Sequence, residues 1–181
     1  MHEKDIVNAN PPVARLDSRL ANWMARHGLT MLRLALGIVF LWFGGQKFFP
    51  ALSEAETLAI RTIDKLSFGM FSADTSRIML AIWECLIGLG LLSGRFMRLT
   101  LGLLFLQMIG TFLPLAFFPN ETWKYPFVPT LVGQYIIKNG VLVSAGIVLG
   151  ATVRGGKLIA DPKAAREAER KQAKAPSDAS R

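Results

Sequence analysis

Four apolar stretches, each close to 20 residues, set what this chain can fold into. They run over about residues 29–49, 78–93, 99–118 and 131–153. An α-helix of about 20 residues crosses the roughly 30 Å hydrocarbon core of a bilayer. We therefore predict an all-α protein, an integral membrane four-helix transmembrane bundle. The first stretch follows 28 mostly polar residues, so it is not a secretory signal peptide.

Composition excludes several other classes. Only 19% of the residues are charged, against about a quarter in soluble domains, and the net charge is +8. The basic residues lie mainly outside the apolar stretches and are not interleaved with aromatics, so nucleic acid is not an expected partner. Cys85 is the single cysteine, which excludes an internal disulfide. His2 and His27 lie outside the spans and predict no metal site.

The distribution of charge predicts the orientation. Fourteen of the 21 Lys and Arg residues lie in 1–28, in the link 94–98 and in 154–181. The other two loops carry four basic and five acidic residues. By the positive-inside rule, both the N and C termini are cytoplasmic, in a multi-pass protein of the cell (cytoplasmic) membrane.

Three segments outside the spans differ in character. Residues 1–28 include a basic amphipathic helix, which lies either on the anionic cytoplasmic leaflet or against the base of the bundle. Residues 50–76 are apolar enough to form an interfacial or re-entrant helix over the outer face. Residues 154–181 read as a basic, disordered tail. The apolar side of the amphipathic helix comprises Val13, Leu16, Leu20, Trp23 and Met24.

Small residues at four-residue spacing predict close helix packing within the membrane. Lipid removes the hydrophobic drive between spans, so close approach supplies much of their association. Seams within the bundle and a homo-oligomer interface both fit this pattern. The residues are Gly37, Gly44, Gly90, Gly94, Gly102, Gly110, Gly140, Ser144, Gly146 and Gly150.

Ionisable residues inside a span are costly, and each one is a candidate site. Glu84 and Lys138 each lie seven positions after a predicted outer boundary, at Arg77 and Leu131, which places both about 10 Å deep. We predict an ion pair between them, with Glu84 as a candidate proton relay. Arg33 is expected to extend to the lipid headgroups. The candidate site in the outer half, with Trp42, Trp83 and Tyr135 around it, comprises Lys47, Glu84, Gln107, Gln134, Lys138 and Asn139.

Three strings of this sequence resemble the DoxX family of small four-helix membrane proteins. They are Leu32–Phe48, Trp83–Leu92 and Gly133–Asn139, and the resemblance extends over about Leu29–Gly156. The first string is the most diagnostic, with Arg33 at its start and Lys47 near its end. The resemblance implies that Glu84 corresponds to the membrane glutamate of the family.

The resemblance also implies a function. Relatives with an assigned activity are subunits of thiosulfate:quinone oxidoreductase, and many members have no established activity. One hypothesis is therefore a membrane subunit of a quinone-linked oxidoreductase, working with a soluble redox or sulfur-transfer partner. The alternative is a non-enzymatic adaptor or small-molecule or lipid carrier, in which Glu84 and Lys138 form a structural pair. A proton-coupled transporter ranks third, because four spans would require an oligomer.

Overall fold

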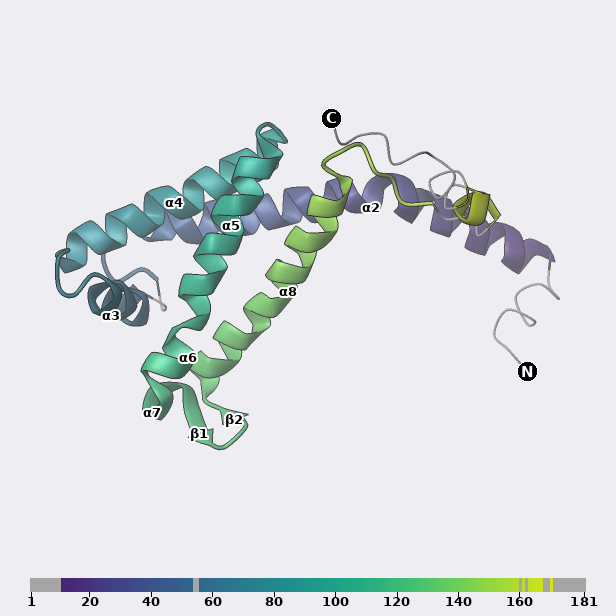
Figure 1. Cartoon of the computed structure of the whole chain (residues 1–181). Helices are drawn as coiled ribbons and strands as arrows, with labels where there is room; N and C mark the ends of the chain where they lie inside the picture. The colour runs from purple at the N-terminus through teal and green to yellow at the C-terminus, as the bar shows by residue number, and fades with distance from the viewer. Residues whose placement is uncertain (1–10, 54–55, 160, 162, 168–169, 171–181) are drawn as a thin grey trace. The chain divides into compact units, whose positions relative to one another are not determined.

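The computed structural model describes residues 11–53, 56–159, 161, 163–167 and 170 (Figure 1). The chain divides into two compact units, one of residues 1–31 with 155–181 and the other of Leu32–Arg154. Four helices are long and apolar enough to cross a membrane, which confirms the predicted helical, four-span fold. They cover Arg15–Gln46, Ala73–Ser93, Met97–Phe117 and Leu131–Thr152.

The first span begins earlier than predicted. Helix α2, Pro11–Gln46, has 36 residues and joins the amphipathic segment and the span in one helix. At 1.5 Å per residue it is about 54 Å long, well over the thickness of a bilayer core. Helix α4, Ala73–Ser93, also starts before the predicted boundary, because the Ser72 side chain accepts a hydrogen bond from the Thr75 amide.

The third span ends within one residue of the prediction but is broken at Pro114, and the chain after it is more structured than predicted. Helix α5, Met97–Phe112, stops before Pro114, because proline lacks an amide hydrogen and clashes with the preceding turn. Two short helices follow, α6, Pro114–Phe117, and α7, Pro119–Thr122. An antiparallel pair of strands that the sequence did not predict, β1, Trp123–Tyr125, and β2, Val128–Pro129, leads to the last span.

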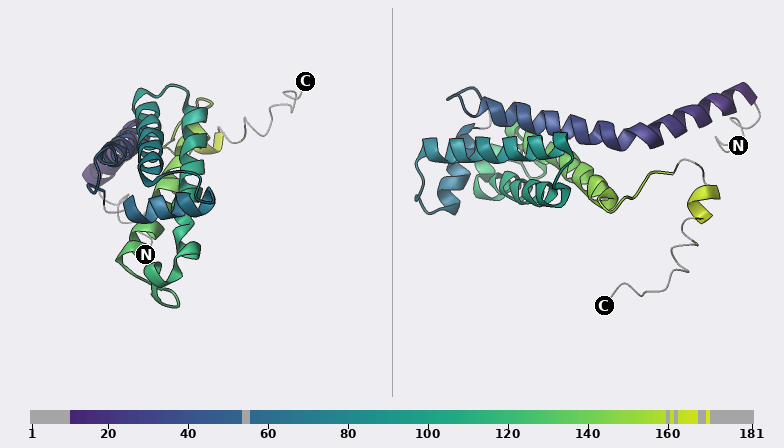
Figure 2. Two further views of the ribbon diagram at one scale, coloured as in Figure 1. Left: turned by 90° about the vertical axis from the view of Figure 1, so that its left-hand side faces the viewer. Right: turned by 90° about the horizontal axis from the view of Figure 1, so that it is seen from above.

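The spans of the Leu32–Arg154 unit pack around one apolar core. Helix α4 runs beside α2, and α5 lies between α4 and α8, Leu131–Thr152 (Figure 1, Figure 2). The long loop contains a helix, α3, Glu56–Leu66, which packs against α4 and α6. We call the end of the unit that holds α3 the α3 end. The buried core comprises Leu36, Phe40, Ile87, Leu91, Leu101, Leu104, Met108, Ala145 and Leu149.

Glycines permit a close approach between α2 and α4. A Cβ on Gly88 would fall 2.6 Å from the backbone nitrogen of Leu41, and one on Gly44 would fall 2.8 Å from the Cβ of Glu84. These distances leave no room for a methyl group, so both glycines are fixed by packing. Three other glycines form no such seam within the described part of the chain, because a Cβ there would meet nothing within 4 Å. These are Gly102, Gly110 and Gly140.

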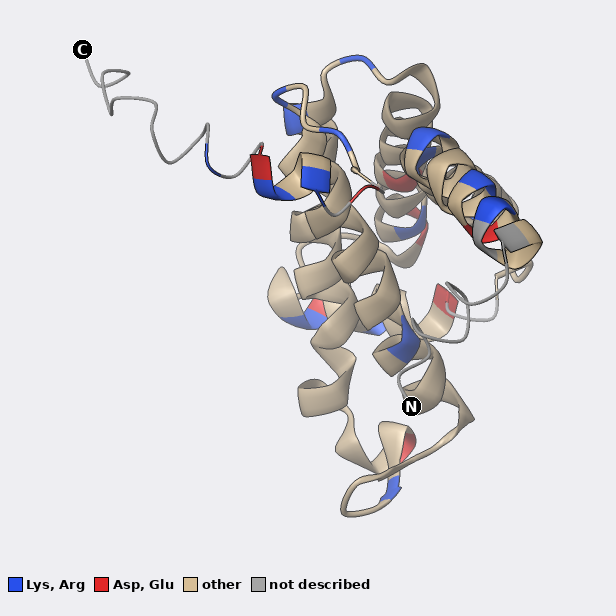
Figure 3. Ribbon diagram, turned by 90° about the vertical axis from the view of Figure 1, so that its right-hand side faces the viewer, with Lys and Arg blue, Asp and Glu red and all other residues tan. Residues whose placement is uncertain are grey.

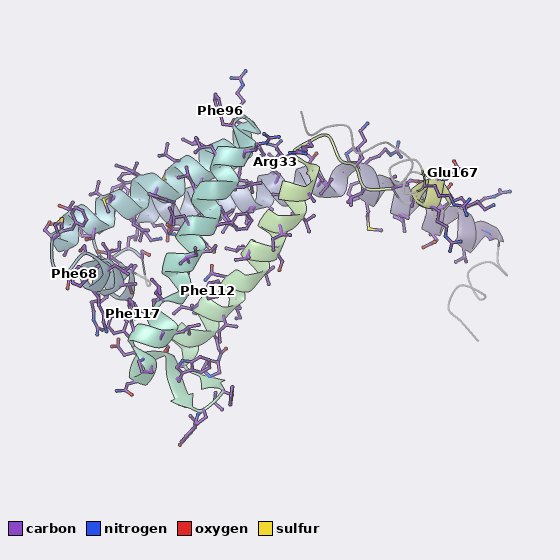
Figure 4. All side chains as sticks on the ribbon, in the orientation of Figure 1. Arg33, Phe68, Phe96, Phe112, Phe117 and Glu167 are labelled. Carbon is purple, nitrogen blue, oxygen red and sulfur yellow. The ribbon has the colours of Figure 1, made fainter. Side chains whose placement is uncertain are left out.

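Two arginines cap the ends of this helix pair reciprocally. Arg33 of α2 donates to the backbone oxygens of Leu91 and Leu92 at the end of α4 (Figure 4). Arg77 of α4 donates to the backbone oxygens of Lys47 and Phe48, at 2.9 and 3.0 Å, just past the end of α2. The expectation that Arg33 extends to the headgroups was wrong, because the unpaired carbonyls of a helix end are near enough to bind it.

Candidate functional site

A buried cluster of three polar side chains joins three spans. The Lys47 ammonium lies 2.6 Å from Oε2 of Glu84, and the Gln107 amide nitrogen donates to Oε1 at 3.0 Å. Lys47 and Glu84 are only 6% and 8% exposed. We call Lys47, Glu84 and Gln107 the polar triad. Its members come from the end of α2, the middle of α4 and α5, so one carboxylate ties three spans together.

The end of α2 determines where the lysine points. Past Gln46, the Lys47 amide donates to the Gly44 oxygen in a tight turn. The side chain then runs back along the helix, and its ammonium reaches the Phe43 oxygen at 3.3 Å as well as Glu84. Long side chains on a helix lean toward its N-terminus, so this direction is the ordinary one. Gly44, one turn earlier on the same face, leaves the space that the Glu84 side chain fills.

Arg77 holds the backbone of this turn at the α3 end. Besides its bond to the Lys47 oxygen, its guanidinium lies 3.7 Å from the Glu56 carboxylate of α3 and 2.9 Å from that of Asp74. Arg77 is itself buried. The triad is therefore linked through Arg77 to the start of α3.

Helix α3 has a second anchor on the chain that follows α5. Nη1 of Arg61 donates to both carboxylate oxygens of Glu121 of α7, each at 2.8 Å, and the Arg61 guanidinium lies 4.4 Å from the centre of the Phe118 ring. Lys65 lies 4.8 Å from the centre of the Phe117 ring. Both contacts are cation–π interactions. The loop helix thus lies against α4 and α6 in a defined place.

The predicted ion pair between Glu84 and Lys138 is wrong, since Glu84 binds Lys47. Depth along a helix says nothing about the direction in which a side chain points. Lys138 shares a face of α8 with Ala145 and Leu149, which are buried in the core. The first turns of α8, however, pack through Gly133 and Ile136, and Lys138 is exposed. Its ammonium lies 5.3 Å from the centre of the Tyr135 ring.

The other candidates on α8 do not join the triad either. Gln134 is exposed, and the Asn139 amide donates to the backbone oxygens of Tyr135 and Ile136 within its own helix. Of the predicted aromatic ring, Trp42 and Tyr135 are well exposed, whereas the Trp83 indole donates to the Leu103 oxygen at 3.2 Å. The structure thus brings together Lys47, Glu84 and Gln107, and leaves Gln134, Lys138 and Asn139 outside.

The sequence contained a signal for the true partner of Glu84. Gly44 and Lys47 are three residues apart and therefore share a face of α2. A glycine beside a lysine marks the face that approaches another helix closely, and a buried lysine needs a carboxylate there. The sequence does not predict the role of Arg77, because its position beside an apolar stretch indicates only the edge of a span.

The triad can do two kinds of chemistry. As an ion pair with a third hydrogen bond, it fixes the register of three helices, because each partner would be left charged and buried alone if the helices slid. As a set of donors and an acceptor within a membrane, it can also bind a polar headgroup or exchange a proton. The ammonium has three N–H groups, and the structure engages two of them.

The described part of the chain contains no candidate metal site. No group of three or more His, Cys, Asp or Glu side chains there is placed to hold an ion. Cys85, beside Glu84, is a half-buried free thiol.

Comparison with known proteins places the chain in a family. No curated protein and no solved structure matches it. The family model described as DoxX matches residues 28–118, which is half of the chain. That range contains the whole polar triad and both capping arginines, and it stops before α8. With its four membrane-spanning helices and this match, the protein belongs to the DoxX family of membrane proteins.

Proposed function

We propose that this protein is the membrane subunit of a quinone-linked oxidoreductase, and that the polar triad is the place where a quinone headgroup binds. The observation that supports this is the buried ion pair with a third polar partner inside the membrane spans. Apolar side chains at these positions would cost less free energy to insert into a bilayer. A charged residue in a span costs about 2.5–3.5 kcal/mol on insertion scales. A charged residue inside a span is therefore a candidate functional residue.

The residues of the triad suit a quinone. A quinone carbonyl needs hydrogen-bond donors, and the Lys47 ammonium and the Gln107 amide supply them. Glu84 can accept or return a proton when the oxygen charge of the ring changes. The bound quinone would supply the electron acceptor. The electrons would come from a soluble redox or sulfur-transfer partner, as the activity of the assigned relatives suggests.

Quinone binding to the full chain tests the proposal. The protein would be reconstituted in quinone-free nanodiscs, and binding of a short-chain quinone would be followed by quenching of tryptophan fluorescence. Trp83, next to Glu84 in sequence, is a suitable reporter. We expect saturable binding to the native chain, and equal binding to Lys138→Met, because that lysine lies outside the triad.

The informative variant is the double change Lys47→Met with Glu84→Leu. It removes both charges together, so neither is left buried alone, and the fold is expected to survive. We expect a loss of at least about tenfold in quinone affinity, which is about 1.4 kcal/mol. Unchanged binding in a folded double variant, or no saturable binding by the native chain, would overturn the proposal.

A second function has an observation of its own. Both oxygens of Glu84 are already engaged within the protein, which favours a structural triad in a non-enzymatic membrane adaptor or carrier. In that case Glu84 pairs with Lys47, not with Lys138. Affinity purification of the full chain from its membranes separates the two. Recovery of a sulfurtransferase or dehydrogenase supports the first function, and a stable complex without a redox protein supports the second.

A further inference from the structure

The N-terminal stretch of α2 carries an apolar stripe that no described residue covers. Val13, Leu16, Leu20 and Trp23 follow one another at spacings of three and four, and all are between 44% and 59% exposed. Met24, equally exposed, and His27, whose ring lies 5.4 Å from that of Trp23, extend the same face. An uncovered stripe of this length on a helix marks a surface that is buried against something.

Basic residues border this stripe on one side. Arg15, Arg19 and Arg26 are spaced by four and seven, so they form a second line along the helix, and all three are exposed. Figure 3 shows their blue segments along this stretch. Asp17 is the single acidic residue between Pro11 and Met31. An exposed apolar stripe beside a basic line is the pattern of a helix that lies in a membrane interface.

The chain after the last span packs on a different face of the same helix. Lys157, Leu158 and Ile159 line a shallow groove together with Asn22 and Ala25 of α2. At about 100° per residue, Asn22 and Ala25 lie roughly 200° and 140° around the helix from Leu20. The C-terminal segment therefore leaves the stripe open. It brings one cation and one anion to the helix, since Lys157 and Asp161 both line the groove with Arg26.

From these observations we propose that residues 13–27 of α2 bind an anionic phospholipid surface, with the stripe inserted among the acyl chains. Arg15, Arg19 and Arg26 then contact lipid phosphates. A bilayer is within reach, because the same helix continues into the first span. The basic residues beside the stripe favour anionic lipid over a second copy of the chain as its partner. A second copy would bring two basic lines together, whereas anionic lipid neutralises their charge.

Spin labels on the full chain in nanodiscs test this proposal. In a Cys85→Ala background, a nitroxide would be attached at Leu20→Cys, within the stripe, or at Ser18→Cys, an exposed matched control about 160° away. In phosphatidylglycerol-rich nanodiscs we expect the label at position 20 to collide with oxygen and to be shielded from an aqueous nickel chelate. The label at position 18 should show the opposite.

The charge dependence distinguishes the possible occupants. Each basic residue near an anionic surface is worth about fivefold in binding, so Arg15→Gln, Arg19→Gln and Arg26→Gln together should lower interfacial partitioning by about a hundredfold. The label at position 20 should then become water-accessible, as it should in phosphatidylcholine. Equal shielding in both lipids, or shielding that coincides with spin–spin broadening between two copies, would overturn the assignment.

Discussion

Two lysines of the membrane unit, Lys47 and Lys138, have opposite surroundings. Lys47 is buried, paired with Glu84 and held at its backbone by Arg77. Lys138 is exposed, and its ammonium lies over the ring of Tyr135. Both lie near the α3 end of a helix, so distance from the end does not distinguish them. What differs is the helix face. The glycine-lined face of α2 meets α4, whereas the first turns of α8 pack through another side.

The largest change in stability is expected when buried Lys47 loses its counter-ion, Glu84. Glu84→Leu leaves a buried, unpaired ammonium, and we expect a loss of about 3–5 kcal/mol in the free energy of unfolding. The double variant with Lys47→Met should recover most of that loss. Unfolding in a denaturing detergent titration gives both values. If Glu84→Leu alone unfolds like the native chain, the pair has no structural role.

A smaller loss is expected when the turn that carries Lys47 loses its anchor. Arg77→Gln removes charged hydrogen bonds to two backbone oxygens and the ion pair with Glu56. We expect a loss of about 2–3 kcal/mol in the same titration. Arg95→Gln is the matched control, because that side chain is exposed in the turn before α5 and should change stability little. Equal effects of the two changes would contradict the capping role.

The packing faces themselves can be compared with one methyl group. Gly88→Ala forces the backbones of α2 and α4 apart and should cost about 1–3 kcal/mol. Gly140→Ala on α8 meets nothing within 4 Å, and it should be neutral or stabilise the helix by up to about 1 kcal/mol. Thermal unfolding of the two variants in one detergent measures the difference. A reversed order would mean that the face of α8 that carries Gly140 is packed more closely than the face of α4 that carries Gly88.

The smallest effect is expected at the exposed lysine. Lys138→Met removes one exposed cation–π contact, worth about 0.5–1 kcal/mol. Its unfolding free energy should therefore fall within about 1 kcal/mol of the native value. A loss as large as that of Glu84→Leu would show that Lys138 has an acidic partner in the membrane, for example in a second copy.

The sequence predicted the spans well and the contacts between them less well. Apolar length identifies four spans regardless of how they pack, and the fourth, Leu131–Thr152, was predicted to within one residue. Which face of a helix meets which neighbour depends on packing between distant segments. Equal depth in the membrane therefore suggested Lys138 as the partner of Glu84. The position of Gly44 on the same face of α2 as Lys47 instead indicates Lys47 as that partner. The break at Pro114 was readable from the chain, whereas the β1–β2 hairpin depends on contacts that no local pattern reveals.

The reciprocal arginine caps have a consequence for how the protein enters the membrane. The end of α2 and the ammonium of Lys47 bind Arg77 and Glu84 of α4, and the end of α4 binds Arg33 of α2. Neither helix is electrostatically complete by itself. We therefore expect α2 and α4 to enter the bilayer together as a helical hairpin. Helix α2 should stay at the membrane-insertion machinery until α4 has also been made.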